Sequence, residues 1–188
     1  GINHGDPITG SHAAGVILAA LRYRKYTGEG MYLDVSQQES AVSLIGGELI
    51  KYQVSNEEPI RMGNKSNLYC PHNVYPSKGN DEWITIAVTN DNQWKILLSK
   101  INAPELNKYS SSDLTNRKAN ESEIDKIISD WSINYEKYEL THILQSVGIP
   151  AAPVMGAPDL FNDPHYIKRE TFETVEDAEA GVHIYPGI

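Results

Sequence analysis

The most constraining feature of the sequence is a run of small and aliphatic residues that follows an Asp-Pro pair near its start. Over residues 7 to about 26 these side chains are dense enough to predict a helix that is buried on most sides. Asp6 is expected to be its N-cap, and Pro7 suits the first helical position, where its missing N–H costs nothing. Gly28 is expected to end the helix.

A short strand and a second helix are predicted next. Residues 31–35 alternate as a strand does. Ser36 is expected to cap a helix that runs to about Val54, with Glu39 completing a capping box. The order helix, strand, helix is typical of an α/β unit.

A change of composition then divides the chain. Residues 55–72 are turn and loop formers without sustained periodicity, so they predict a boundary between two lobes. Beyond it we expect an α+β arrangement, with an irregular polar stretch at residues 102–120. Its predicted elements are a hairpin at 74–75 and 83–88, helices at 92–101, 121–131 and 135–146, an edge strand or extended crossing within 149–155, a helical turn at 159–162, and one or two strands within 171–185.

Composition argues against several classes of protein. The 188 residues include 16 Lys and Arg against 25 Asp and Glu, and a net charge of −9 makes binding to nucleic acid or an anionic membrane by bulk electrostatics a poor prospect. The longest apolar stretch, residues 13–21, is shorter than the roughly 18 residues of a membrane span, and no basic segment precedes it. We therefore expect a soluble protein. Its one cysteine, Cys70, suits a reducing cytoplasm.

Asp6 is the leading candidate for chemistry. At a helix N-terminus the dipole and the free N–H groups favour a negative charge, so its carboxylate is available as a nucleophile or an electrostatic anchor. An aspartate at this position can also serve only as a helix cap, and the capping preference of aspartate, taken alone, favours this structural role over a catalytic one.

Other side chains support fewer kinds of chemistry. The six histidines show no paired metal-ligand spacing, so no metal site is predicted. The sequence contains no serine-hydrolase elbow, phosphate loop or dinucleotide fingerprint. Cys70 lies beside His72 and could form a thiolate, although lone loop cysteines are more often inert. Tyr69, Tyr75 and Trp83 could line a ligand cleft between the lobes, or belong to the core.

A series of motifs, in order along nearly the whole chain, resembles the class III CoA-transferases, the carnitine dehydratase and bile-acid-inducible F family. The motifs include Gly5-Asp6-Pro7-Ile8-Thr9-Gly10, Thr27-Gly28-Glu29-Gly30, Asp34-Val35-Ser36-Gln37-Gln38-Glu39, Arg61-Met62-Gly63-Asn64, Pro71-His72-Asn73-Val74-Tyr75-Pro76, Trp83-Ile84-Thr85-Ile86-Ala87-Val88, Gln93-Trp94, Gly148-Ile149-Pro150-Ala151-Ala152-Pro153-Val154 and Asp163-Pro164-His165.

The resemblance implies an α/β fold with two domains. Residues 1–54 would be part of a Rossmann-like large domain, 55–72 a linker, 73–131 a small α+β domain, and 132–188 a return segment toward the large domain, truncated at its end. It also implies that the chain is the C-terminal part of a longer enzyme. The net charge of −9 is consistent with this, because most groups that bind the polyanionic coenzyme A would then lie on the preceding part.

The resemblance also implies a mechanism. Asp6 matches the family's nucleophile, which forms an acyl-aspartyl anhydride and then an aspartyl-CoA thioester. Gln37 would lie near the CoA cleft, and Tyr69 is assigned to substrate binding. The acyl-CoA is a substrate, and no tightly bound cofactor is expected. Family members form intertwined homodimers, so a cytoplasmic homodimer is predicted.

Alternatives remain open at this point. The family includes α-methylacyl-CoA racemases, and the chain could also act only as a binding or dimerisation module. Formyl-CoA transferases carry a glycine-rich loop where this chain has Ser66-Asn67-Leu68-Tyr69-Cys70. This bulkier loop argues against oxalate and formate and leaves carnitine, succinate or another carboxylic acid as acceptor.

Overall fold

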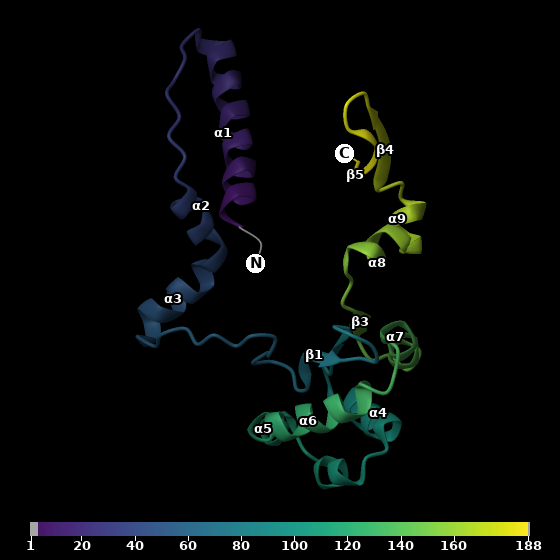
Figure 1. Cartoon of the computed structure of the whole chain (residues 1–188). Coiled ribbons are helices and arrows are strands. Elements are labelled where there is room, and N and C mark those ends of the chain that lie inside the picture. The colour runs from purple at the N-terminus through teal and green to yellow at the C-terminus, as the bar shows by residue number, and fades with distance from the viewer. Residues whose placement is uncertain (1–3, 188) are drawn as a thin grey trace. The chain divides into compact units, whose positions relative to one another are not determined.

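The computed structural model describes residues 4–187, and the chain divides into two compact units between Arg61 and Met62. The division falls within the 55–72 stretch that lacks sequence periodicity. The first unit is helical (Figure 1), with α1 (Gly5–Thr27), α2 (Gln37–Val42), the 3-10 turn η1 (Ser43–Ile45) and α3 (Gly46–Ser55).

Helix α1 begins earlier than the sequence predicts. His4, the residue before it, already has helical backbone angles, so Asp6 lies inside the first turn. An N-cap residue has non-helical angles, and the predicted capping role of Asp6 is therefore wrong. At the other end Gly28 has φ 80° and donates its N–H to the Arg24 carbonyl, which confirms the predicted C-terminal stop.

The predicted burial of α1 is also wrong for this chain. None of its residues is buried, and Leu18 and Leu21 are 68% and 54% exposed. Helix α2 packs against α1 (Figure 1), but a helix of 6 residues covers little of one of 23 residues. Helix α1 therefore carries more apolar side chains than the rest of its own unit can cover.

No strand forms over residues 31–35, where one is predicted. This segment is extended but unpaired, because the strands among the described residues all lie in the second unit. The predicted Ser36 cap is confirmed, because the Ser36 hydroxyl accepts the Glu39 N–H at 3.2 Å. The return hydrogen bond from the Ser36 N–H to the Glu39 side chain, which would complete the capping box, is absent from the described residues. The second helix reaches Ser55 as α3, but η1 interrupts it.

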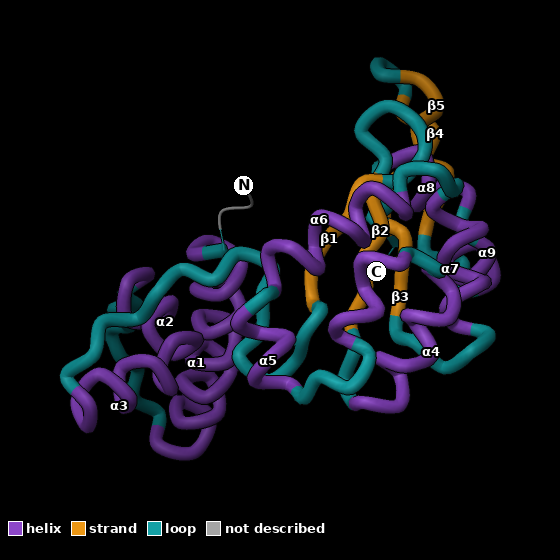
Figure 2. Tube along the Cα trace, turned by 90° about the horizontal axis from the view of Figure 1, so that it is seen from below, coloured by secondary structure: helices purple, strands orange, loops and turns teal. Residues whose placement is uncertain are grey.

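The second unit is built on a three-stranded antiparallel sheet in the order β1-β2-β3 (Figure 2). Strands β1 (His72–Pro76) and β2 (Trp83–Ala87) form the predicted hairpin, with Val74 opposite Thr85. Strand β3 (Ala151–Pro153) lies at the edge, which confirms the edge-strand reading of the proline-containing run. The helices that accompany the sheet are α4 (Asp91–Ile101), α6 (Glu121–Ser132) and α7 (Lys137–Gln145).

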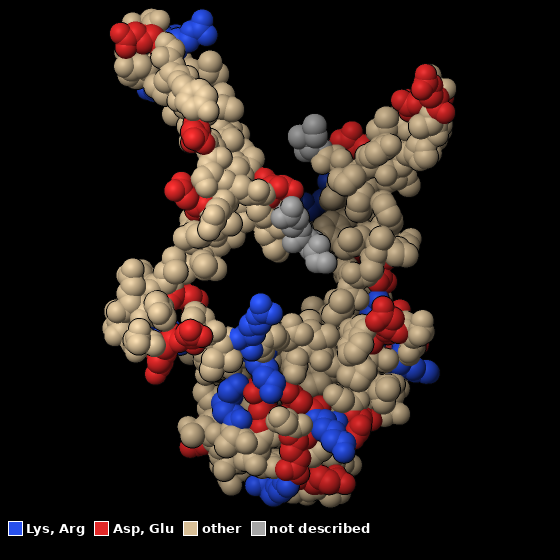
Figure 3. All heavy atoms as spheres, turned by 60° about the vertical axis from the view of Figure 1, so that its left-hand side comes forward, with Lys and Arg blue, Asp and Glu red and all other residues tan. Residues whose placement is uncertain are grey.

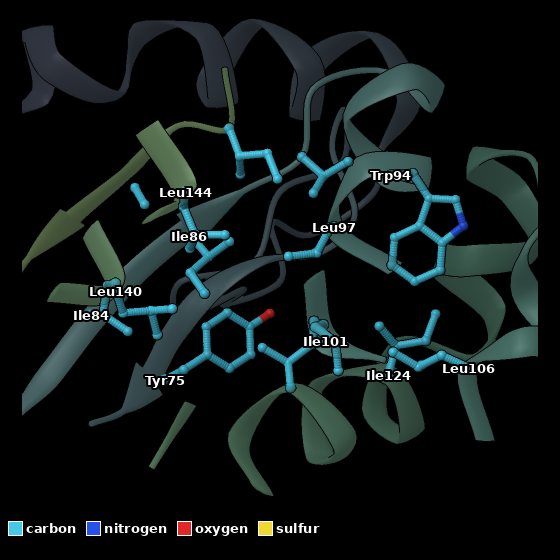
Figure 4. Packing of buried hydrophobic residues seen from close by; sticks show 14 of the residues in the cluster. Tyr75, Ile84, Ile86, Trp94, Leu97, Ile101, Leu106, Ile124, Leu140 and Leu144 are labelled. Carbon is cyan, nitrogen blue, oxygen red and sulfur yellow. The ribbon is translucent and has the colours of Figure 1, made fainter. Parts of the chain in front are cut away.

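Alternate residues of the sheet point into one core (Figure 4). Tyr75, Ile84 and Ile86 pack with side chains of the three helices, and the pattern follows the two-residue period of a strand. The core extends past residue 131, where the sequence places the end of the small domain. The core helix residues include Trp94, Leu97, Ile124, Ile128, Leu140 and Leu144.

The stretch 102–120 is more ordered than its composition suggests. It forms the 3-10 helix η2 (Pro104–Tyr109) and helix α5 (Leu114–Ala119). Tertiary contacts fix α5, because the buried Arg117 guanidinium donates to the Cys70 carbonyl and to Asp91. The Asp113 carboxylate caps α5 by accepting the Asn116 N–H at 2.8 Å, a signal that the sequence does contain.

The chain continues as α8 (Ala157–Asn162), α9 (Pro164–Lys168) and the hairpin of β4 (Phe172–Asp177) and β5 (Gly181–Pro186), so the predicted helical turn and terminal strands are confirmed. On the face of the second unit seen in Figure 3, blue Lys and Arg side chains lie among red Asp and Glu side chains. Within residues 4–187, no helix combines the length and apolar character needed to cross a membrane.

Candidate active site

Asp6 and Gln37, two of the three candidate site residues, are in contact within the first unit. The Gln37 side-chain amide donates a hydrogen bond from Nε2 to Oδ1 of Asp6 at 2.5 Å, although the residues are 31 positions apart. Asp6 lies in the first turn of α1, and Gln37 is the first residue of α2. Both side chains are exposed to solvent. The contact thus joins the N-terminal ends of two helices.

The position of Asp6 on α1 determines its electrostatic surroundings. The first N–H groups of a helix have no partner within it, and together they form the positive end of the helix dipole. A carboxylate in that turn is stabilised as an anion. The same N–H groups would also stabilise an oxyanion that develops on a bound acyl group.

Gly5 makes the contact between Asp6 and Gln37 sterically possible. A Cβ atom at this position would lie 2.7 Å from Gln37 Nε2 and 3.2 Å from its Cδ, which is too close for an unmoved side chain. In the sequence Gly5 stands out only as part of a motif. Residue spacing cannot predict that the side chain of Gln37, which lies far along the chain, packs against it.

A groove of about 500 Å³ lies between α1 and the segment that returns to α2. Its walls include Ser11, His12 and Val16 of α1, and Ser36 next to Gln37. His12 is exposed on this wall. The groove offers a concave surface for a ligand in the first unit.

Thr9 is a further polar residue near Asp6, and no sequence pattern singles it out. Its hydroxyl oxygen is buried and has no hydrogen-bond partner among the described residues. The hydroxyl of a helical threonine can donate to the carbonyl four residues earlier. Thr9 lies three positions after Asp6, on the same face of α1.

Tyr69 lies in the second unit, where its ring stacks on that of His72 with centroids 6.1 Å apart. The other two aromatic candidates have structural contacts. The Tyr75 hydroxyl donates to Asp125 at 2.6 Å, and burial together with that carboxylate raises the Tyr75 pKa, so the phenol stays protonated. The Trp83 indole donates to Asp81 at 2.7 Å.

Cys70 is not an activated thiol. It is fully buried, and burial raises its pKa to about 12, with nearby Glu121 adding to the effect. The loop before it is held in place, since Lys65 pairs with Glu121 at 3.4 Å and Lys118 donates to the Ser66 carbonyl at 2.7 Å. The structure shows no cluster of three or more potential metal-ligating side chains within residues 4–187.

Comparison with known proteins identifies the family. The family model described as CoA-transferase family III matches residues 1–187. The chain belongs to CoA-transferase family III. It is 32% identical over 180 residues to the succinyl-CoA:mesaconate CoA-transferase of Haloarcula hispanica, covering 96% of this chain and 44% of that protein. It is 27% identical over 191 residues to the succinate–glutarate CoA-transferase of Agrobacterium fabrum, covering 100% and 46%.

Solved structures show the same fold. A CaiB/BaiF family protein from Brucella suis superposes with a TM-score of 0.83 at 23% identity, covering 97% of this chain and 51% of that one. The chain therefore has the class III CoA-transferase fold, and it spans about half the length of the relatives it matches.

Proposed function

We propose that this chain carries the nucleophile of a CoA-transferase, and that Asp6 is that residue. The observation that supports the proposal is the placement of Asp6 in the first turn of α1, in hydrogen-bond contact with Gln37, in a chain that belongs to CoA-transferase family III. The carboxylate is exposed, and the positive end of the helix lies beside it.

The chemistry proceeds in balanced steps. The Asp6 carboxylate attacks the acyl-CoA carbonyl, and the thiolate of coenzyme A leaves as an acyl-aspartyl anhydride forms. The thiolate then attacks the aspartyl carbonyl of the anhydride, which releases the first acid as a carboxylate and leaves an aspartyl-CoA thioester. The acceptor carboxylate attacks this thioester, and the returning thiolate attacks the acceptor's acyl carbon to free Asp6. Splitting the transfer in this way is covalent catalysis.

The substrates proposed are a succinyl-CoA donor and a dicarboxylic acid acceptor. The names of the Haloarcula hispanica and Agrobacterium fabrum relatives describe transfer between acids of this kind. The bulky loop at residues 66–70 argues against oxalate and formate. We assign Gln37 to the CoA side of the site and Tyr69 to substrate binding.

The proposal extends to the whole enzyme. Residues 1–54 would belong to a Rossmann-like large domain, joined by the linker 55–72 to a small domain at 73–131, and 132–188 to a return segment. The first part of that return segment would also complete the core of the small domain, because Leu140 and Leu144 pack in it. The enzyme would act in the cytoplasm as a homodimer, with acyl-CoA as substrate and without a tightly bound cofactor.

The test replaces Asp6 by Asn in the purified intact enzyme, which keeps the shape of the side chain and removes the nucleophile. With succinyl-CoA and mesaconate, we expect transfer to fall to the uncatalysed rate. Mass spectrometry of the wild-type peptide that contains Asp6 should show bound coenzyme A, and the variant should show none. Glu29→Gln, an exposed carboxylate away from the contact, is the matched control and should retain wild-type turnover.

Two outcomes would overturn the proposal. One is near wild-type turnover by Asp6→Asn. The other is uptake of deuterium at the α-carbon of a 2-methylacyl-CoA in deuterated water without any acceptor acid, which would assign the enzyme to the racemase branch instead.

A further inference from the structure

Gln37 does more than lie near a ligand cleft, because its side-chain amide contacts the Asp6 carboxylate directly. Gln37 Nε2 lies 2.5 Å from one particular carboxylate oxygen, Oδ1. A side-chain amide has two N–H donors and carries no charge, so it can bind a carboxylate without neutralising it. Hydrogen bonds to ionised acceptors are also stronger than those between neutral groups.

The local fold holds both partners in place. Ser36 caps α2, its carbonyl accepts the Ser40 N–H at 3.0 Å, and Ser40 is buried. These contacts fix the backbone of Gln37, which follows Ser36 directly. Gly5 completes the arrangement from the other helix, because any larger residue there would put a Cβ atom 2.7 Å from Nε2.

We propose that Gln37 is a second catalytic group of the transfer reaction, which holds Asp6 Oδ1 throughout the cycle, and that Gly5 provides the space for it. The inference rests on the proposed role of Asp6 as nucleophile. The Asp6 oxygen bound by Gln37 remains as the aspartyl carbonyl oxygen, and the other oxygen forms the anhydride bond. The amide thereby fixes the rotation of the carboxylate for attack.

The same hydrogen bond acts again in the second step. When the thiolate of coenzyme A attacks the aspartyl carbonyl, the electron pair of the carbonyl bond moves onto Oδ1, the atom that Gln37 Nε2 contacts. The anhydride then loses the first acid as a carboxylate, and the carbonyl re-forms as the thioester. A donor placed at a developing oxyanion lowers the barrier to its formation. Gln37 would thus assist each attack on the Asp6 carbonyl.

The first experiment compares Gln37→Leu with the wild type in the intact enzyme. Leucine lacks the terminal amide and therefore has no donor, and loss of one oxyanion donor costs about 10²–10³-fold in kcat. Because this contact is exposed, we expect a loss below that range, of at least about 30-fold in kcat, and a smaller change in KM for succinyl-CoA. Gln38→Leu, at the next exposed position of α2, is the control and should turn over as the wild type does.

The second experiment uses Gln37→Glu. Near pH 7 the introduced carboxylate repels Asp6, so activity should be lower than in Gln37→Leu. As the pH falls toward the ordinary glutamate pKa of about 4.3, the introduced group becomes a protonated donor and relative activity should recover. A purely structural role for Gln37 predicts no such change in the pH profile.

The third experiment is a double-mutant cycle with Gly5→Ala. If Gly5 acts by giving Gln37 its space, Gly5→Ala alone should lower kcat much as Gln37→Leu does. The double variant should then be no worse than either single one. Multiplied losses would contradict the role of Gly5.

The outcomes separate this inference from the function on which it rests. Absence of transfer and of the covalent adduct in the wild type would refute the CoA-transferase assignment itself. A wild type that forms the adduct on Asp6, together with a Gln37→Leu variant of unchanged kcat, would leave the assignment standing and refute the role of Gln37. Circular dichroism of each variant identifies any loss of folding, and the pH profile of Gln37→Glu provides an independent measurement.

Discussion

The two units of the chain differ in where their apolar side chains lie. In the first unit α1 buries none of its residues, yet this helix carries Asp6. In the second unit a sheet and its helices enclose a continuous core, in which Ile84, Leu97 and Leu144 are fully buried. Apolar density in the sequence therefore predicts burial only where the same chain provides the surface that covers it. Substitutions should consequently affect the two units very differently.

We expect the largest difference in loss of stability between alanine substitutions of two leucines, one in each unit. Leu144→Ala empties part of the closed core, and such changes cost about 2–5 kcal/mol of stability. Leu18→Ala removes a side chain that is already 68% exposed, so its effect should be within about 0.5 kcal/mol. Tryptophan fluorescence during urea unfolding of the 188-residue chain measures the effect of Leu144→Ala, because Trp83, Trp94 and Trp131 all lie in the second unit. The effect of Leu18→Ala, in the first unit, is measured by helical circular dichroism.

Circular dichroism of the same samples follows the helices of both units, and the part of its change that does not coincide with the fluorescence transition reports the first unit. Equal losses of stability from the two substitutions would show that α1 is as well covered as α7. The distinction between the units would then be wrong.

A smaller effect is expected from the two ion pairs of the buried Lys137 in the second unit. Lys137 Nζ lies 2.6 Å from Asp159 and 2.7 Å from Glu82, and it joins α7 to α8 and to the β1–β2 turn. Burial lowers the Lys137 pKa, but its hydrogen bonds to Asp159 and Glu82 outweigh this and raise it overall. Because both carboxylates are partly exposed, we expect Lys137→Met to lower the free energy of unfolding by about 1.5–3 kcal/mol in total, the range for one hydrogen bond to a charged group.

The matched control is Lys108→Met. Lys108 pairs with Glu123 at 2.6 Å, but both side chains are exposed, and an exposed pair contributes about 0–1 kcal/mol. Similar shifts of the denaturation midpoint in the two variants would mean that burial of Lys137 adds nothing.

Local signals in the sequence predict the fold best where they need no distant partner. The Ser36 cap, the Gly28 stop and the β1–β2 hairpin depend on neighbouring residues, and the structure has all three. The strand expected at residues 31–35 needed a paired neighbour, and the first unit provides none in its described part. The start of α1 was misplaced because an Asp-Pro pair fits two positions in a helix, the cap and the first turn.

The candidate site shows the same limit. Resemblance to a family drew attention to Asp6 and Gln37 separately, but no periodicity relates positions 31 residues apart. Their contact depends on how α2 folds back to α1, and on Gly5 leaving room for an amide. Such a close approach follows from tertiary structure and cannot be derived from spacing.

A cap in each unit provides a third test. Asn90 caps α4 by accepting the Gln93 N–H at 2.9 Å, and α4 contributes Trp94 to the core. Asn90→Ala should lower the free energy of unfolding of the second unit by about 1 kcal/mol. Ser36→Ala should instead speed amide exchange in α2 and leave the Trp94 fluorescence transition unchanged. A shift of that transition by Ser36→Ala would show that the units unfold together.

The smallest effect concerns acid stability and Asp159. Hydrogen bonds from Lys137 and from the Gly156 backbone N–H lower the Asp159 pKa from 3.8 to about 2. Because the folded-state pKa is the lower one, the stabilisation is fully present above the ordinary value of 3.8 and is lost as the pH falls toward 2. Asp159→Asn should therefore flatten this part of the stability curve of the second unit. Comparing urea midpoints of the variant and the wild type from about pH 5 to about pH 2.5 isolates this carboxylate, since the other acidic groups titrate in both proteins. A difference that stays constant over this range would mean that Asp159 binds Lys137 no more strongly as an anion than as a neutral acid, and that the contact between α7 and α8 does not depend on charge.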